Sequence, residues 1–337
     1  MRGLLLVNIG SPESPSRGDV AAYLRRFLSD RHVLRMPALL RLALVNLIIV
    51  PLRSSRSASV YGRLWDGDTF PLVRHANRLA SKVSALMPEV NVKAAMRYGS
   101  PSIEQSINDM VNEGVTDISI LPLYPHFAIS TVTSAVSEAE RVAAKHNSLT
   151  ISTLPCFYDH PSYIGAMTSL ITAHRHKQGS DGFLFSFHGL PLNHLPCSRE
   201  CATRCNNSTW RGCVDTVRHN DCYRLQCFEG AALIAAKAQL TSYKVAFQSR
   251  MGRGEWLRPT LSQQLDDMRL DGVKSLHVIA PSFTADCMET LWELDTEARE
   301  AFEHSGGRMY YIPCLNDDTA WCQCVADMFA AHHHSTI

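Results

Sequence analysis

Residues 182–191 read GFLFSFHGLP, a nearly continuous apolar run that ends in His188 and is followed at once by a glycine. Strands of a parallel sheet are covered on both faces, so they are apolar almost throughout, whereas a half-exposed strand alternates apolar with polar residues. Gly189 and Pro191 then turn the chain. The stretch therefore predicts a buried parallel strand with His188 at its exit.

The same kind of run recurs along the chain, with helical patterns between the runs. The other seven are LLLVNI at 4–9, VKAAMRY at 92–98, DISILPLY at 117–124, LTISTLP at 149–155, YKVAFQS at 243–249, SLHVIAP at 275–281 and RMYYIPC at 308–314. Such alternation is typical of a doubly wound α/β fold. Because the eight runs divide into four and four, we expect two similar Rossmann-like lobes, each with a four-stranded parallel sheet flanked by helices. Their expected bounds are 1–160 and 161–337, with an active cleft where strand ends from both lobes meet.

Length and charge narrow the class of protein. The chain has 337 residues, enough for two lobes, and its 33 Lys and Arg balance 32 Asp and Glu. It lacks the excess of positive charge that nucleic-acid binding requires. Neither a G-x-G-x-x-G nor a Walker phosphate-binding motif occurs. Small molecules or metal ions are therefore the expected partners.

Two apolar stretches bear on localisation. The N-terminal MRGLLLVNIGSPES has too short an apolar run for a signal peptide and no cleavage site, which predicts a cytoplasmic protein. In MPALLRLALVNLIIVPLR at 36–53, Arg41, Asn46 and two prolines interrupt the run before it reaches a membrane-spanning length. We expect a buried or interfacial pair of helices there, and peripheral contact with the inner membrane stays open.

A row of carboxylates follows the strand predicted at 275–281. In ADCMETLWELDTEARE at 285–300, Glu289, Glu293 and Glu297 are four residues apart and so lie near one face of a helix. Like charges at that spacing repel, and no lysine relieves them. A solvated acidic face is one interpretation. The other is a path for a cation, because carboxylates bind hard divalent ions and the row would enter the same cleft as His188.

His188 itself has two interpretations. A neutral imidazole at a strand exit can act as a general base near neutral pH. A structural histidine that is bonded to a backbone carbonyl would give the same sequence pattern.

The chain has eleven cysteines, which in a cytoplasmic protein indicate metal or redox chemistry before disulfides. Six lie in the segment 195–227: Cys197, Cys201, Cys205, Cys213, Cys222 and Cys227. With His194 and His219 nearby, they could bind zinc, although the paired C-x-x-C spacing of common zinc sites is absent. The alternative is a reduced, solvent-facing insertion.

Several long motifs, in order, give the chain a resemblance to a known family. They are LLLVNIGSPESPSRGDVAAYLRRFLSDRHVL at 4–34, AMRYGSPSI at 95–103, LPLYPHFAISTVTS at 121–134, FSFHGLP at 185–191, VAFQSRMGRGEWLRPT at 245–260 and PSFTADCMETLWELDTEARE at 281–300. Together they resemble the ferrochelatases, which insert ferrous iron into a porphyrin. The resemblance runs nearly end to end.

The resemblance implies roles for single residues. His188 matches the histidine at the metal insertion site and Glu289 the glutamate that faces it, so these two would be catalytic. Together with Glu293 and Glu297 they would also handle the metal. The porphyrin would contact Ile9, Arg97, Tyr98, Leu121, Pro122, Tyr124, Ser249, Gly252 and Trp256. The segment 61–73 stands where the family has its lip over the porphyrin but departs from the family's sequence there.

Four other cysteines resemble the ligands of a 2Fe-2S cluster in some bacterial ferrochelatases. They are Cys156, Cys314, Cys322 and Cys324, the last three on or near a helix at the end of the second lobe. Cys156 could instead be a small buried apolar residue. Cys287, beside the acidic row, is expected to line the active site and not to bind a cluster.

The resemblance thus implies a cytoplasmic enzyme that inserts Fe²⁺ into protoporphyrin IX, forming protohaem with release of two protons, at the end of haem biosynthesis. One alternative is a chelatase for coproporphyrin III, another tetrapyrrole or another metal. A second is a non-catalytic haem or iron-sulfur sensor. The oligomeric state is not predicted.

Overall fold

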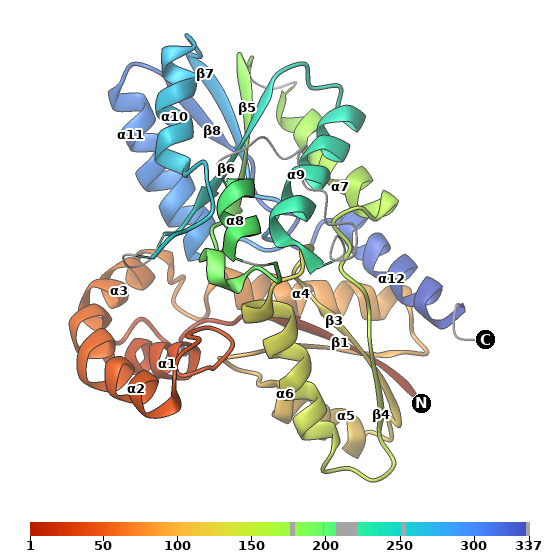
Figure 1. Ribbon diagram of the computed structural model, residues 1–337. Helices are drawn as coiled ribbons and strands as arrows, with labels where there is room; N and C mark the ends of the chain where they lie inside the picture. The colour runs from red at the N-terminus through yellow and green to blue at the C-terminus, as the bar shows by residue number, and fades with distance from the viewer. Residues whose placement is uncertain (176–178, 198, 207–220, 251–253, 335–337) are drawn as a thin grey trace. The chain divides into compact units, whose positions relative to one another are not determined.

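The computed structural model describes residues 1–175, 179–197, 199–206, 221–250 and 254–334. Its eight described strands form two parallel four-stranded sheets with helices on their faces, ordered β2-β1-β3-β4 and β6-β5-β7-β8 (Figure 1). All eight predicted strands are present, and the α/β fold class with two four-stranded parallel sheets is confirmed. The strands are β1 (Arg2–Asn8), β2 (Asn91–Met96), β3 (Asp117–Pro122), β4 (Thr150–Thr153), β5 (Gly182–His188), β6 (Tyr243–Gln248), β7 (Ser275–Ile279) and β8 (Arg308–Tyr311).

The described α-helices before β5 are α1 (Arg17–Leu28), α2 (Ala38–Ala43), α3 (Val50–Leu64), α4 (Pro71–Leu86), α5 (Ile103–Asn112), α6 (Ser134–Ala143) and α7 (Pro161–Arg175). Those after β5 are α8 (Arg199–Asn206), α9 (Tyr223–Lys237), α10 (Leu261–Leu270), α11 (Arg299–His304) and α12 (Thr319–His334). Three π-helical segments, η1 (Leu44–Ile49), η2 (Ile129–Thr133) and η6 (Glu289–Ala298), run directly into α3, α6 and α11.

The two most apolar runs form the central strands. In β1, Leu4, Leu5, Leu6 and Val7 have no exposed surface, because β2 and β3 pair with its two edges and helices cover both faces. The strand β5 has the same position between β6 and β7. Burial on both faces therefore explains why neither strand alternates polar with apolar residues.

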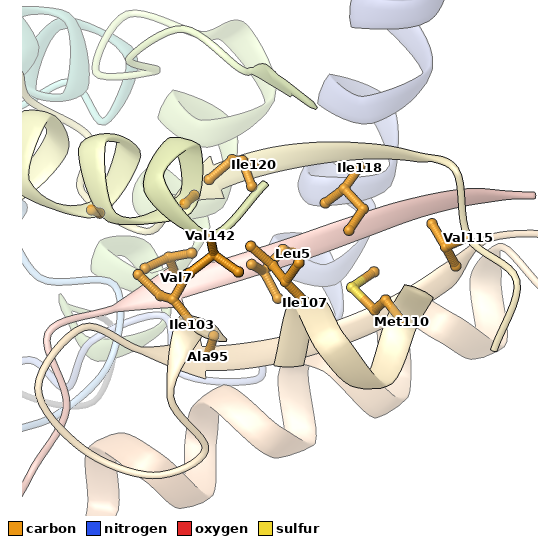
Figure 2. Packing of buried hydrophobic residues seen from close by; sticks show 12 residues of the cluster. Leu5, Val7, Ala95, Ile103, Ile107, Met110, Val115, Ile118, Ile120 and Val142 are labelled. Atoms are coloured by element: carbon orange, nitrogen blue, oxygen red, sulfur yellow. The ribbon is translucent and has the colours of Figure 1, made fainter. Parts of the chain in front are cut away.

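Helix α5 shows how the helices are fixed to the first sheet. Ile103, Ile107 and Met110 lie one helical turn apart on one side of α5 and pack against a cluster that includes Leu5 and Ile118 (Figure 2). The Ser102 hydroxyl accepts a hydrogen bond from the backbone N–H of Gln105 and so caps the helix. The sequence of this segment thus sets both where the helix begins and which side it buries.

The chain divides into two compact units. The first consists of Met1–Leu123, Ile129–Pro155 and Asn316–Ile337, and the second of Tyr124–Ala128 and Cys156–Leu315. The predicted assignment of the C-terminal helix to the second lobe is therefore wrong. Helix α12 packs on α4 in the first unit, where Asp317 contacts His75 at 2.8 Å and Lys82 at 2.7 Å.

The apolar stretch at 36–53 does not form a pair of helices. The segments α2, η1 and α3 follow one another without a break from Ala38 to Leu64, a helix that is long and apolar enough to span a membrane. Pro51 lacks the N–H that an α-helix needs, and the wider hydrogen-bonded turn of η1 directly before it accommodates the proline without ending the helix. The expected interruption is therefore absent.

Candidate active site

His188 is held at the end of β5 by three contacts of its backbone and ring. Its N–H donates to the Ser282 hydroxyl at 2.9 Å, and its carbonyl accepts from the Tyr223 hydroxyl at 2.8 Å. Ring atom Nδ1 lies 2.6 Å from the carbonyl oxygen of Gly189. A Cβ at position 189 would lie 2.6 Å from the Gln248 carbonyl, so glycine is required for this turn. Both the position and the rotation of the imidazole are thereby fixed.

The Gly189 contact also decides which ring nitrogen carries the proton in the neutral imidazole. A carbonyl oxygen can only accept, so Nδ1 carries the hydrogen and Nε2 keeps its lone pair. Burial lowers the pKa of His188, although the negative charge of Glu289 and the Gly189 carbonyl oppose that effect. The site therefore contains a neutral imidazole whose Nε2 can accept a proton. The structural interpretation of His188 is confirmed by this contact with a backbone carbonyl, and its role as a general base stays a prediction.

The carboxylate row lies on η6, a π-helix of ten residues, and not on the expected α-helix. Its turns close through hydrogen bonds between residues five apart, as in the bond from the Arg299 N–H to the Leu294 carbonyl. Such turns are uncommon, usually occur singly and are frequent at functional sites. Glu289 and Glu293 are half-buried, whereas Glu297 is exposed. The row therefore runs from the interior of the second unit to its surface.

Gln248 joins His188 to this row and was missed in the sequence. It is 3% exposed, pairs in register with His188, and accepts a hydrogen bond from Ser186 through its side-chain oxygen at 2.6 Å. Its amide nitrogen donates to the Glu289 carbonyl at 2.8 Å. One side chain thus fixes the start of η6 relative to β5. No signal in the sequence singles it out, because the run at 243–249 also contains the polar residues Lys244 and Ser249.

The pKa of Glu293 lies near neutrality. Burial, followed by the negative charge of Glu289, raises its pKa to about 7, although a hydrogen bond from the Ser249 hydroxyl lowers it. Ser249 has a φ of 64°, a left-handed conformation that costs a serine about 1 kcal/mol. The residue with this strained backbone conformation is therefore the one whose hydroxyl donates a hydrogen bond to Glu293.

The beginning of η6 is anchored by Asp286, a second residue that the sequence did not single out. The buried Asp286 carboxylate accepts from the Tyr311 hydroxyl at 2.6 Å, the Thr290 hydroxyl at 3.2 Å and the Cys314 N–H at 3.2 Å. It thereby ties the first turn of η6 to the segment that follows β8. Cys287 is buried next to it, and burial raises the pKa of its thiol.

Trp256 lies beside the His188 turn. It forms an isolated backbone bridge with Pro191, and a Cβ at Gly189 would lie 3.5 Å from its ring. Asn206, at the end of α8, donates to the Trp256 carbonyl at 3.0 Å and accepts from the Arg258 N–H at 2.8 Å. The first helix of the cysteine-rich segment therefore supports the loop that carries Trp256.

The described cysteines of that segment do not converge on a metal site. Cys197, Cys201, Cys205 and Cys222 are half-buried, and Cys227 is buried. Burial, followed by the neighbouring thiols of Cys201 and Cys222, raises the pKa of Cys197 to about 12. Among the residues described within either unit, no group of three or more His, Cys, Asp or Glu is arranged to hold a metal ion. Cys213 and His219 lie outside the described residues.

The predicted porphyrin residues of the first unit are engaged inside it. The Arg97 guanidinium contacts Asp30 at 2.8 Å and Ser134, and the buried Tyr98 hydroxyl donates to Asp30 at 2.8 Å. The Arg97 N–H donates to the carbonyl of Asn8, the last residue of β1, at 2.8 Å, and the Tyr98 N–H donates to the Ile9 carbonyl at 3.0 Å. The backbone of Arg97 and Tyr98 therefore holds the end of β1 and the half-buried Ile9 that follows it.

The remaining predicted wall residues differ in exposure. Leu121 and Pro122 are buried at the end of β3, whereas Tyr124 is half-buried in the second unit. Gly252 lies outside the described residues. In the predicted lip at 61–73, Asp66 accepts from the N–H groups of Asp68 and Thr69 and pairs with Arg74, which closes the loop before α4.

The four predicted cluster cysteines are shared between the units. Cys156 and Cys314 belong to the second unit and Cys322 and Cys324 to the first. The donors suit a cluster, since all four are thiols and three of them are at most 7% exposed. Neither unit by itself contains the four ligands, and the assignment stays a prediction.

Comparison with solved structures identifies the fold. Over 98% of the chain the structure matches CbiX, the terminal enzyme of siroheme biosynthesis in denitrifying bacteria, with a TM-score of 0.52, 15% identity and 99% of that chain covered. It also matches the sirohydrochlorin chelatase SirB of Bacillus subtilis in complex with cobalt, with a TM-score of 0.52, 12% identity and 92% of that chain covered. The fold is that of metal chelatases.

Sequence comparison identifies the family. The ferrochelatase family model matches residues 1–333. The ferrochelatase of Bdellovibrio bacteriovorus is 39% identical over 97% of this chain and 98% of its own, and that of Pseudomonas paraeruginosa is 40% identical over 96% of both. The chain belongs to the ferrochelatase family and is a metal chelatase of the bacterial type, with a porphyrin and iron as the substrates that the family implies.

Proposed function

We propose that the protein inserts Fe²⁺ into protoporphyrin IX to give protohaem, with release of two protons. The observation that carries the proposal is the hydrogen bond from His188 Nδ1 to the Gly189 carbonyl, which leaves Nε2 as a proton acceptor at the start of a carboxylate row. Metal insertion replaces two pyrrole N–H bonds by bonds to iron, so the reaction needs a base for each proton.

His188 takes the first role in this proposal. Nε2 accepts a pyrrole proton, and the imidazolium that forms is stabilised by the charge of Glu289. Glu293, with a pKa of about 7, can gain and lose a proton at neutral pH without a large change in free energy. Protons therefore pass from His188 along Glu289 and Glu293 to the exposed Glu297, while the same carboxylates attract the cation.

The porphyrin itself must be bent for its nitrogen lone pairs to meet the metal. Trp256 provides a rigid aromatic surface next to His188, held through Asn206 and the bridge to Pro191. Stacking against such a ring holds one side of the macrocycle in place. Trp256 is accordingly a binding residue and not a proton carrier, and its loss should raise KM more than it lowers kcat.

The test is anaerobic insertion of Fe²⁺, followed by the loss of porphyrin fluorescence, with wild type and His188→Ala. His304→Ala is the matched control, because the His304 Nδ1 also bonds to a backbone carbonyl, that of Glu300, but lies outside the site. We expect His188→Ala to lose at least a hundredfold in kcat while still binding porphyrin, and the control to keep full activity. Full turnover by His188→Ala would remove His188 from the mechanism.

The substrate is tested in the same assay by offering protoporphyrin IX and coproporphyrin III in parallel, and ferrous iron against cobalt. The higher kcat/KM identifies the porphyrin, and preference for coproporphyrin III would replace protoporphyrin IX in the proposal. Tight binding of porphyrin by wild type without turnover would instead favour a haem sensor.

We further propose that Cys156, Cys314, Cys322 and Cys324 bind a 2Fe-2S cluster, for which thiolates are the expected ligands. Burial raises the pKa of each thiol, to about 12 for Cys156 and Cys324, so cluster loading must release protons. Anaerobically purified protein should show iron-sulfur absorbance and acid-labile sulfide, which Cys324→Ser should lose. Absence of both in wild type would end this assignment, and no step of metal insertion depends on it.

A further inference from the structure

The cysteine-rich segment 195–227 contacts the candidate active site through both of its described helices. Asn206 is the last residue of α8, and Tyr223 is the first residue of α9. The side chain of Tyr223 bonds to the backbone of His188, and that of Asn206 bonds to the backbone of Trp256. A solvent-facing insertion, one of the two interpretations of this segment, would require neither contact.

Tyr223 holds the backbone of His188. Its hydroxyl donates to the His188 carbonyl at 2.8 Å and lies next to the hydroxyl of Ser282, which accepts from the His188 N–H at 2.9 Å. Burial raises the pKa of Tyr223 well above its ordinary value, so the phenol keeps the proton that it donates. Both polar groups of the His188 backbone are therefore bonded to hydroxyl groups of the second unit.

The carbonyl that Tyr223 holds belongs to the peptide bond between His188 and Gly189. Rotation of this peptide would move the Gly189 carbonyl away from His188 Nδ1, and that contact is the one that keeps the hydrogen on Nδ1 and the lone pair on Nε2. The hydroxyl of Tyr223 therefore acts on the tautomer of His188 through the turn that follows it.

The ring of Tyr223 is held by packing that does not involve its hydroxyl. It lies edge-on to the ring of His126 at 5.9 Å, and His126 lies edge-on to Phe187 at 5.2 Å. His126 is buried, and burial lowers its pKa to about 3, so this cluster of rings is uncharged. Phenylalanine at position 223 would therefore keep the packing of α9 and lose only the hydrogen bond to His188.

Asn206 holds the loop that carries Trp256. Its amide nitrogen donates to the Trp256 carbonyl at 3.0 Å, and its amide oxygen accepts from the Arg258 N–H at 2.8 Å. The backbone of Trp256 also pairs with Pro191, in the turn after His188. Loss of the Asn206 amide would therefore remove two hydrogen bonds from this loop and leave its pairing with Pro191.

We propose that the cysteine-rich segment is part of the active site, with Tyr223 as the positioning residue of His188 and Asn206 as the positioning residue of Trp256. Each acts through the residue whose backbone it holds. The two helices serve different steps, because His188 takes a proton and Trp256 stacks on the macrocycle. The proposal rests on the proposed function, which assigns these two roles.

The test is steady-state iron insertion, together with protoporphyrin IX binding measured by fluorescence, for Tyr223→Phe, Asn206→Ala and the double variant. Tyr223→Phe should lower kcat about tenfold and leave KM within about twofold, because the base is misplaced and the porphyrin surface is intact. Asn206→Ala should raise KM and the porphyrin Kd about tenfold and leave kcat within about twofold. In the double variant the two effects should multiply, because the two side chains share no hydrogen-bond partner.

The controls remove the same chemical groups away from the site. Tyr243→Phe deletes a phenol hydroxyl at the start of β6, at the opposite end of the sheet from the His188–Gln248 pair. Asn108→Ala deletes an amide that bonds to His146 in the first unit. Both controls should keep the wild-type kcat and KM, and urea unfolding should show that all variants are folded in the assay.

The ¹⁵N NMR signals of the His188 ring, assigned by their absence from His188→Ala, give a measure that needs no turnover. The hydrogen should be on Nδ1 in wild type, and both tautomers should appear in Tyr223→Phe. If wild type inserts no iron, the proposed function fails, while the tautomer and the porphyrin Kd still test the two positioning roles. An unchanged kcat and tautomer in Tyr223→Phe, an unchanged KM and Kd in Asn206→Ala, or the same loss from a variant and its control would overturn the proposal.

Discussion

Replacing Glu293 with glutamine should make the protein more stable at alkaline pH, although it removes a hydrogen-bonded carboxylate. The ordinary pKa of a glutamic acid is 4.5 and that of Glu293 is about 7, because burial and the charge of Glu289 oppose its ionisation. Glutamine has the same shape and can still accept from Ser249, but it cannot ionise. The substitution therefore isolates the free-energy cost of the charge.

The magnitude follows from the difference between these two values. Each pH unit corresponds to about 1.4 kcal/mol, so an ionised Glu293 lowers the free energy of unfolding by about 3 kcal/mol. Below pH 4.5 the carboxyl is protonated in both states and costs nothing. As pH rises from 4.5 to about 7, the unfolded chain ionises while the folded chain keeps its proton, so stability falls. Above pH 7 the deficit is constant.

The assay is urea unfolding of the full chain without metal or porphyrin, at pH 5 and pH 8. The gain in free energy of unfolding from Glu293→Gln should be about 2 kcal/mol larger at pH 8 than at pH 5. Ser249→Ala removes the hydrogen bond that lowers the Glu293 pKa, so the decline in stability should extend to higher pH. If wild type and Glu293→Gln changed in parallel between the two pH values, the raised pKa and the proton-carrying role of Glu293 would both be refuted.

Three further predictions concern the residues that hold the site and the fold. Gln248→Leu removes the hydrogen bonds from Ser186 and to the Glu289 carbonyl. In steady-state kinetics it should lower kcat between about tenfold and a hundredfold with little change in KM. An unchanged kcat would mean that Gln248 is not needed to position η6. Burial alone would raise the pKa of Asp30, but hydrogen bonds from Ser134, His32 and Tyr98 and the charge of Arg97 hold this pKa below its usual value. The ionised Asp30 therefore stabilises the folded protein above about pH 4, and this contribution is lost as the pH falls further. Asp30→Asn should therefore cost about 2 to 4 kcal/mol at pH 7 and show a smaller loss of stability on acidification, measured by urea unfolding; equal acid sensitivity of variant and wild type would contradict this. Met110→Ala, in the fully buried cluster of Figure 2, should cost about 3 kcal/mol in the same assay, and a cost below about 1 kcal/mol would show that the core collapses around the gap.

Single residues show why part of the site could be predicted. His188 and Glu289 carry their chemistry in their own side chains; His188 ends one strand and Glu289 follows another, and both strands have apolar runs that the sequence shows. Gln248 and Asp286 act only through partners: Gln248 bonds to the Glu289 carbonyl, 41 residues further along the chain. Nothing local marks such a residue, because a hydrogen bond between distant residues has no spacing that a sequence displays. Asn206 was missed for the same reason, since its partners lie 50 and 52 residues away.

The sequence by itself determined the eight strands and the parallel α/β class, because burial on both faces requires local apolar runs, and it supplied the candidate base and the acidic row as residue types. The tertiary structure decided how those elements are used. It made the acidic segment a π-helix, whose first turns are held by Gln248 and Asp286, and it set the tautomer of the His188 imidazole, with the proton on Nδ1, through the Gly189 carbonyl. It also placed α12 in the first unit, through an Asp317–His75 contact across 242 residues. Helix type, tautomer and docking depend on contacts between segments that only folding brings together, and a hydrophobic pattern carries no record of them.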